Sequence, residues 1–387
     1  MRDGKAERGS VVIRGTRRWI LLAIAMILAV AGIAVWQWSP LASSGPARNS
    51  TRPASSSPAS GSPASGGSET SRNGGGPTRT PATAVSTPTS RSSSVLPDPI
   101  HRMLLGAFTD LTGHQGTEAA VEQREAAMGR RYDLEVTYYN WDDVFPDSGE
   151  AAIAAHNRTP VMTWYGPGKD DGDHRTLAEI NSGQDDPWIL RQAGAIRDFG
   201  HRIYLRVMPE MNGDWYYGFS GNPAAFIAAW QRIHRIFGQA GATNVTWVWC
   251  PNITPYDWDR YYPGNAYVDI IGVDGFSNTR YIWQTFEHMF DSFLAHYAGR
   301  KPLMVDETAT NSGAGDPAAG FGSAATFISG MDSYLRDVAG PHYGVVGVCW
   351  FDTDAIDNHD WRVDQTPSAW QAWLSLARDP YFGGHGG

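Results

Sequence analysis

Two glutamates in matching sequence contexts are the residues of this chain best suited to do chemistry. Glu210 lies in the segment 208–215 (MPEMNGDW), directly after an apolar run that ends at Val207, and Glu307 closes a second such run over residues 301–305. Each is therefore predicted at the C-terminal tip of a buried strand. Two carboxyl groups among tryptophans can hydrolyse a glycosidic bond, because one protonates the leaving oxygen while the other attacks or stabilises the anomeric carbon. The alternative is a pair of ordinary surface glutamates.

Eight short apolar runs alternate with amphipathic helical patterns after residue 103. This alternation predicts an α/β fold, a (β/α)8 TIM barrel rather than an open doubly wound sheet. The C-terminal ends of barrel strands share one mouth, so the carboxyl groups after the fourth and seventh strands should approach each other. The predicted strands are residues 103–108, 134–139, 160–164, 202–208, 245–249, 268–273, 302–305 and 345–350, with helices over residues 224–237 and 282–297.

The composition favours a neutral, ring-shaped ligand. The 387-residue chain has a net charge of −9, and all but three of its 16 tryptophans follow residue 97. We expect no nucleic-acid partner because the acidic charge lies in the folded part, and no nucleotide because no glycine-rich phosphate motif follows a strand. Cys250 and Cys349 lie in predicted strands, where they are either a disulfide or plain core residues. We expect no metal site and no cofactor. We expect a monomeric domain that binds a polysaccharide.

The N-terminal part of the chain predicts export. Residues 1–18 are basic, and residues 19–38 form an apolar run edged by tryptophans, typical of a transmembrane anchor whose basic end stays in the cytoplasm. A cleaved signal segment is the competing interpretation. Residues 39–97 are rich in Ser, Pro, Thr and Gly and should form a disordered linker. Residues 98–387 would then be a barrel held outside the cell membrane by a single span, or secreted.

Three motifs together resemble glycoside hydrolase family 26, which is best known for β-1,4-mannanases. They are residues 210–215 (EMNGDW), residues 258–275 with WDRYYPG and GVDG, and residues 301–307 (KPLMVDE), and the resemblance covers residues 103–375. It implies a retaining glycosidase with Glu210 as general acid/base and Glu307 as nucleophile. It also implies that Trp215 and Trp350 line the cleavage site and that Asp274 is a polar residue at its edge.

The chain departs from this family at three positions around the reacting sugar. Pro209 stands where mannanases usually have His, Phe276 stands where the family has a tyrosine that touches the nucleophile, and Tyr165 stands where many members have His after Trp164. A site that loses such donors discriminates differently between sugars. The substrate therefore stays open between mannan, mixed-linkage β-glucan and an exopolysaccharide. A catalytically impaired polysaccharide-binding barrel and a cell-wall transglycosylase are the alternatives.

Further candidate residues lie at or just past the predicted strand ends. Aromatic rings at such places can stack on sugar faces. Asp352, Asp354 and Asp357 lack the spacing of a calcium loop and are interpreted as solvated acids. The predicted substrate-binding residues are Trp164, Tyr165, Asn212, Trp215, Trp249, Asp274, Phe276 and Trp350, and weaker candidates are Tyr139, Trp141, Tyr256, Trp258, Asp110, His114 and His359.

Overall fold

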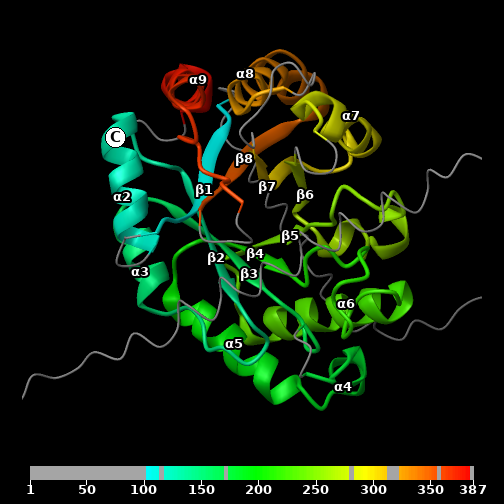
Figure 1. Cartoon of the computed structure of the whole chain (residues 1–387). Coiled ribbons are helices and arrows are strands. Elements are labelled where there is room, and N and C mark those ends of the chain that lie inside the picture. The colour runs from blue at the N-terminus through cyan, green and yellow to red at the C-terminus, as the bar shows by residue number, and fades with distance from the viewer. Residues whose placement is uncertain are drawn as a thin grey trace, which may run out of the picture. The chain divides into compact units, whose positions relative to one another are not determined.

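A closed barrel of eight parallel strands forms the centre of the folded part (Figure 1). The computed structural model describes residues 102–112, 117–169, 173–278, 283–311, 322–354 and 359–383. Each strand pairs with its neighbours in sequence, and β1 closes the ring against β8. The strands are β1 Leu104–Asp110, β2 Leu134–Tyr139, β3 Thr159–Trp164, β4 Ile203–Val207, β5 Val245–Trp249, β6 Ile270–Asn278, β7 Leu303–Asn311 and β8 Val345–Thr353.

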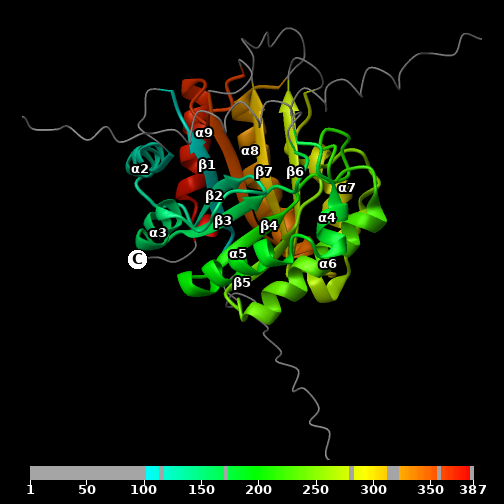
Figure 2. The ribbon, with the colours of Figure 1, turned by 90° about the horizontal axis from the view of Figure 1, so that it is seen from below.

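Helices surround the strands, as both ribbon views show (Figures 1 and 2). They are α2 Thr117–Met128, α3 Ser148–Ala155, α4 Leu177–Ser182, α5 Asp186–Phe199, α6 Pro223–Ala240, α7 Phe286–Tyr297, α8 Ala324–Tyr334 and α9 Pro367–Arg378. Short 3₁₀ segments are η1 Trp258–Tyr261, η2 Asn265–Tyr267 and η5 Pro380–Phe382, and a π-helical segment, η4 Leu335–Tyr343, continues α8.

Local sequence sets where the longest helix begins and ends. Asn222 accepts a hydrogen bond from the Ala225 amide, and Pro223 takes the first helical position of α6, where its missing N–H costs nothing. Gly241 ends α6 in the left-handed conformation at φ 75°. The apolar face of α6, which includes Trp230, is buried against the barrel. Packing of this kind fixes the strand ends that carry the site.

The barrel interior changes in character from one end to the other. Its lower part is an apolar cluster of Leu134, Val136, Val161, Tyr204, Val248, Cys250, Ile270, Met304 and Cys349. Both cysteines are free and buried, so they are core residues. Towards the C-terminal mouth the interior becomes polar, with Thr163, Arg206, Asp274 and Glu307 buried together. A second, larger apolar cluster lies between the strands and the helices.

The predicted strand order is confirmed, but β6 and β7 are longer than expected. We expected β6 to end at Val273 and β7 at Val305, whereas they end at Asn278 and Asn311. Asp274 and Glu307 therefore lie within paired strands, directly opposite each other, and not on the loops beyond them. The apolar runs stop at the point where the interior becomes polar, so hydropathy marks that change and not the strand ends.

No described helix is long and apolar enough to cross a membrane. The expected membrane span at residues 19–38 and the expected linker at residues 39–97 lie outside the described residues.

Asp306 is a buried carboxyl group in the barrel interior. It is the extra residue of a bulge, because Val273 pairs with Val305 while Asp274 pairs with Glu307. A side chain at Gly272 would collide with the Asp306 carboxylate, so only glycine leaves room for it there. Neither carboxyl oxygen has a hydrogen-bond donor in standard geometry. Burial, supported by the negative charge of Glu307, raises the pKa of Asp306 to about 7.

We predict that Asp306→Asn flattens the pH dependence of stability. The folded pKa lies above the usual value, so the folded state binds this proton more tightly than the unfolded chain. The free energy of unfolding of the native protein should therefore fall as pH rises from about 4 to about 7. The neutral amide of the variant does not titrate, so the variant does not lose this stability as pH rises. Its melting temperature should therefore increase relative to that of the native protein as pH approaches 8. The exposed Asp198→Asn is the control, and an unchanged pH slope in Asp306→Asn would contradict the prediction.

Candidate active site

Glu210 lies on a strained turn directly after β4. Met208 and Glu210 have φ values of 46° and 54°, in the left-handed region that side chains other than glycine rarely adopt. The turn is held on both sides, because the Met208 amide donates to the Trp164 carbonyl at 2.8 Å and the Glu210 amide donates to the Cys250 carbonyl at 2.8 Å. Neighbouring strand ends thus maintain a backbone shape that costs free energy, which is typical of functional sites.

The carboxyl group of Glu210 is buried and held at both oxygens. The Asn252 side-chain amide donates to Oε1 at 2.6 Å, and the Trp215 indole donates to Oε2 at 3.1 Å. Burial and then the negative charge of Glu307 raise the pKa of Glu210 to about 7. A carboxyl group with this pKa can give a proton and take one back near neutral pH.

Glu307 lies across the mouth in a different environment. Its Oε1 accepts a hydrogen bond from the Tyr138 hydroxyl at 2.6 Å and another from Nη2 of Arg206. Its side chain is 5% exposed and forms an ion pair with the Arg206 guanidinium. Of the two glutamates, Glu210 has the raised pKa that suits an acid, whereas Glu307 has a cationic partner. Two carboxyl groups in such different environments can take different roles in a reaction.

Arg206 connects the strands beneath the two glutamates. Its Nε and Nη2 donate to the Thr163 hydroxyl at 3.0 and 2.6 Å, and its Nη1 donates to both oxygens of Asp274 at 3.0 and 3.2 Å. The guanidinium is fully buried. β3, β4, β6 and β7 each contribute one member of this network. Asp274, expected at the edge of the site, is instead buried in the barrel with Arg206 as its partner.

Four of the other expected residues are placed near the two glutamates. Trp215 contacts Glu210, as described, and Tyr165 stacks on Tyr138 with ring centroids 6.2 Å apart. Phe276 packs edge-on against Phe351 at 5.6 Å. Asn212 acts indirectly, through Asn252. Its side-chain amide donates to the backbone carbonyls of Asn252 and Pro255, and its side-chain oxygen accepts from the backbone amide of Asn252. Asn212 therefore positions the residue that holds Glu210.

The expectation that Trp164, Trp249 and Trp350 bind substrate is wrong. All three are fully buried on the outer face of the barrel. Trp164 stacks on Trp141, Trp249 packs edge-on against Tyr297 of α7, and Trp350 packs against Phe327 and Trp373 of α8 and α9. Side chains alternate across a strand, and Thr163, Cys250 and Phe351 take the inward positions beside them.

Other weak candidates also differ from expectation. Tyr139 faces outward and donates to Glu150 at 2.5 Å, and Trp258 is buried with its indole on the Asn252 carbonyl. Asp352 is not a solvated acid, since it is buried and paired with Arg124 at 2.8 Å. His359 stacks on Trp361, which contacts Phe276. Asp110 is the last residue of β1, Tyr256 is exposed, and His114 and Asp357 lie outside the described residues.

Sequence reasoning missed Tyr138, Arg206 and Asn252. The sequence did contain a signal for Arg206, because a charged residue inside an apolar strand needs a buried partner. The signal for Tyr138 was weaker. Two adjacent tyrosines at the end of β2 place one ring on each face of the strand, and we named only Tyr139. Asn252 lies past β5 and is brought to Glu210 by an isolated bridge to Asp274, which no local pattern indicates.

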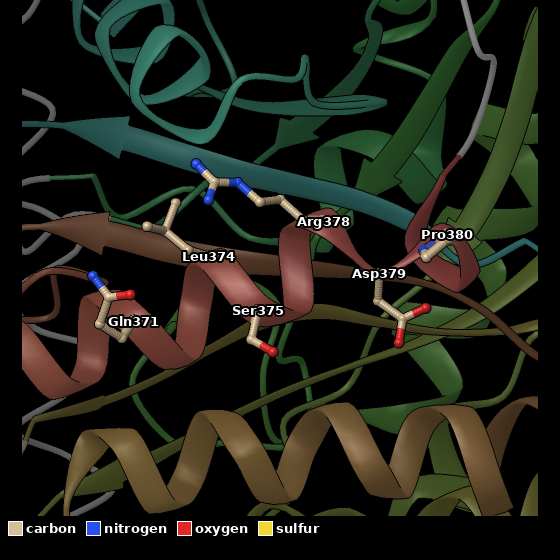
Figure 3. A pocket seen from close by; sticks show the side chains of 6 residues that line it. All are labelled: Gln371, Leu374, Ser375, Arg378, Asp379 and Pro380. Carbon is tan, nitrogen blue, oxygen red and sulfur yellow. The ribbon is translucent and has the colours of Figure 1, made fainter.

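Two other features of the described residues are poor candidates for the site. Cys250, Asp274 and Asp306 offer ligand atoms within 4.8 Å of one another, but the Arg206 cation already pairs with Asp274 and disfavours a second cation there. A surface hollow lies beside the C-terminal half of α9, lined by Gln371, Leu374, Ser375, Arg378, Asp379 and Pro380 (Figure 3). The Arg378 and Asp379 side chains there are bound to Met128 and Arg336.

Known proteins resemble this chain in sequence. Residues 187–314, which include both glutamates, match the model of glycosyl hydrolase family 26. Endoglucanase H of Acetivibrio thermocellus is 29% identical over 279 residues, covering 67% of this chain and 29% of that protein. Mannan endo-1,4-beta-mannosidase A and B of Caldalkalibacillus mannanilyticus is 26% identical over 146 residues, covering 35% of this chain and 25% of that protein. The matches thus span less than a third of either relative.

Solved structures resemble the barrel as well. The GH26 β-mannanase BoMan26A of Bacteroides ovatus superposes with a TM-score of 0.52 at 13% identity, covering 73% of this chain and 90% of that one. GH26C of Muricauda sp. superposes with a TM-score of 0.55 at 14% identity, covering 73% and 86%. At these identities the likeness shows the fold alone. Residues 187–314 of this chain are thus similar in sequence to glycoside hydrolase family 26, and the barrel is similar in fold to enzymes of that family.

Proposed function

We propose that the barrel is a retaining endo-β-glycosidase that hydrolyses a β-linked polysaccharide. The observation that supports this most is the contrast between its two buried glutamates. Glu210 has a pKa raised to about 7, while Glu307 accepts hydrogen bonds from a guanidinium and a phenol. A proton donor facing an ionised carboxylate is what double displacement at an anomeric carbon needs.

The proposed reaction has two steps. In the first, Glu307 attacks the anomeric carbon while Glu210 protonates the departing glycosidic oxygen, which leaves a covalent glycosyl-enzyme. In the second, Glu210 takes a proton from water as the water attacks the same carbon and Glu307 departs. The Trp215 indole and the Asn252 amide hold Glu210 in place during this exchange.

The proposed substrate is β-1,4-mannan, mixed-linkage β-glucan or an exopolysaccharide. Relatives named as an endoglucanase and as mannan endo-1,4-β-mannosidases support the first two. Half-buried rings of Phe108, Tyr138 and Phe276 at the mouth offer apolar faces to a sugar chain. The test is release of reducing ends by the full-length protein from mannan, mixed-linkage glucan, xylan and the producer's own exopolysaccharide. Binding in affinity electrophoresis without new reducing ends would instead identify a polysaccharide-binding protein, and longer products at high acceptor concentration a transglycosylase.

We also propose that residues 19–38 anchor the barrel at the outer face of the cell membrane. The basic residues before this run and its terminal tryptophans support an uncleaved single span. The full-length protein should then stay in the membrane fraction after high-salt and carbonate washing, and external protease should reach the barrel. A soluble secreted form that begins near Ser43 or Arg48 would identify a signal peptide instead.

Replacing the nucleophile should give a variant that a small anion can rescue. Glu307→Ala should abolish hydrolysis of the polysaccharide, because no carboxylate remains to attack. Azide should occupy the vacated space and restore turnover, giving a glycosyl azide of inverted configuration that NMR can identify. Glu287→Ala, on the exposed face of α7, is the control and should behave like the native protein. Near-native activity of Glu307→Ala would show that another group attacks.

Replacing the acid should affect substrates according to their leaving groups. Glu210→Ala should lose about 10²- to 10⁴-fold on polysaccharide, the usual contribution of a placed general acid. A dinitrophenyl glycoside needs no protonation, so the variant should release a burst of phenol and then turn over slowly.

The pH profile provides a second test of the same residue. Native activity should fall above about pH 7, where Glu210 loses its proton, and Glu210→Ala should lack this basic limb. Equal losses on both substrates without a burst would mean that Glu210 only binds the sugar.

A further inference from the structure

The two hydrogen bonds to Glu307 converge on one of its two carboxylate oxygens. The Tyr138 hydroxyl lies 2.6 Å from Oε1, and Nη2 of Arg206 donates to the same atom. Neither donor reaches Oε2. A carboxylate whose charge is stabilised at one oxygen presents the other, less stabilised oxygen to an electrophile. The geometry thus distinguishes two atoms that are chemically equivalent in a free glutamate.

Tyr138 is held in this position by its neighbours. Its ring packs edge-on against Phe108 at 4.9 Å and Phe351 at 6.5 Å, and it stacks on Tyr165 at 6.2 Å. The Arg206 guanidinium lies 5.8 Å from the ring centroid. Residues from β1, β4, β8 and the end of β3 therefore determine where the hydroxyl points.

The Tyr138 hydroxyl is a donor that keeps its proton. Burial and the adjacent Glu307 charge raise the pKa of Tyr138 well above its usual value. On β6 the corresponding region is apolar, because Phe276 packs against Phe351 and Trp361 at 5.6 Å each. The hydroxyl that contacts the nucleophile therefore comes from β2, on the other side of Phe351.

We propose that Tyr138 is a positioning residue that, with Arg206, binds Oε1 of Glu307 and leaves Oε2 as the attacking atom. This rests on the proposed glycosidase function and specifies how its nucleophile is oriented. In the first step Oε2 bonds to the anomeric carbon, the bond to the leaving oxygen breaks, and Glu210 gives that oxygen its proton. In the second step water bonds to the carbon, Glu210 takes the proton of the water, and the electron pair of the broken bond returns to Glu307.

The two donors should matter more in the second step than in the first. In the glycosyl-enzyme Oε1 is the carbonyl oxygen of an ester, and negative charge returns to it as the sugar departs. A hydrogen bond at Oε1 stabilises that charge and so favours departure. In the first step the same bond makes the carboxylate less basic, which opposes attack. Loss of the hydroxyl should therefore slow deglycosylation without slowing glycosylation.

The experiment compares Tyr138→Phe with Tyr139→Phe in the full-length protein. On a dinitrophenyl glycoside, Tyr138→Phe should lower kcat by roughly tenfold or more, the usual value of a hydrogen bond to a charged group. KM should fall in parallel, so that kcat/KM stays within about threefold of the native value. Intact-mass measurement should show the glycosyl-enzyme accumulating.

Tyr139→Phe is the matched control because it removes a similar bond from the opposite face of the same strand. Its hydroxyl donates to Glu150 at 2.5 Å, outside the barrel. This variant should melt at a lower temperature but keep the native kcat and KM. A loss of kcat/KM as large as that of kcat in Tyr138→Phe, without accumulation of the intermediate, would overturn the proposal.

A titration that needs no turnover separates this proposal from the proposed function. The chain has eleven glutamates, so ¹³C-carboxyl labelling gives a countable set of resonances, and Glu307→Gln identifies the one of interest. Its midpoint should move to higher pH in Tyr138→Phe and not in Tyr139→Phe. An unmoved midpoint would overturn the role of Tyr138 even in an active enzyme. A moved midpoint in a protein that cleaves no glycan would overturn the function and keep the contact.

The other charged and titratable groups around Glu307 are common to both variants, so the comparison isolates the hydroxyl. These groups lie on β4, β6, β7 and β8 and on the loops that follow β3 and β4. They are Tyr165, Arg206, Glu210, Tyr216, Asp274, Asp306 and Cys349.

Discussion

The buried guanidinium of Arg206 is the group on which the rest of the site depends. A charge removed from water must be balanced nearby, and Arg206 is balanced by Asp274 and Glu307. Removing one member of such a buried group leaves another charge unpaired, which costs roughly 3–5 kcal/mol. Glu307, the proposed nucleophile, is therefore also a structural residue. The ion pairs of Arg206 with Asp274 and Glu307 connect β4, β6 and β7 across the barrel.

The barrel and the two central carboxyl groups were predictable because they depend on periodicity and on position along the chain. Apolar runs at regular intervals indicated eight strands in the right order, and Glu210 and Glu307 follow the change from apolar to polar sequence. Hydropathy records burial among apolar neighbours, whereas strand pairing continues into the polar part of the interior. For this reason Asp274 and Glu307 were expected past the ends of strands that in fact continue to Asn278 and Asn311.

What the sequence did not reveal is which face of a strand each ring occupies near the mouth. A shift of one residue exchanges the inner and outer faces, so Tyr138 and Tyr139, or Trp350 and Phe351, have opposite surroundings although they are neighbours. Tryptophan in an active-site motif and tryptophan between strands and helices look the same in sequence. The contacts of Asn252 depend on loops from two strands meeting, which local patterns do not record.

The two glutamates differ in how their backbones are supported. Glu307 lies within β7, paired on one side with Asp274 of β6, whereas Glu210 lies on a left-handed turn held by neighbouring strand ends and by Asn212 and Asn252. The proposed nucleophile is thus part of the sheet, and the proposed acid is part of the loops. Changes in the loops after β4 and β5 can alter the position of Glu210 relative to the leaving group, while the position of Glu307 stays the same. A barrel built in this way can change its substrate without a change in the strand that carries its proposed nucleophile.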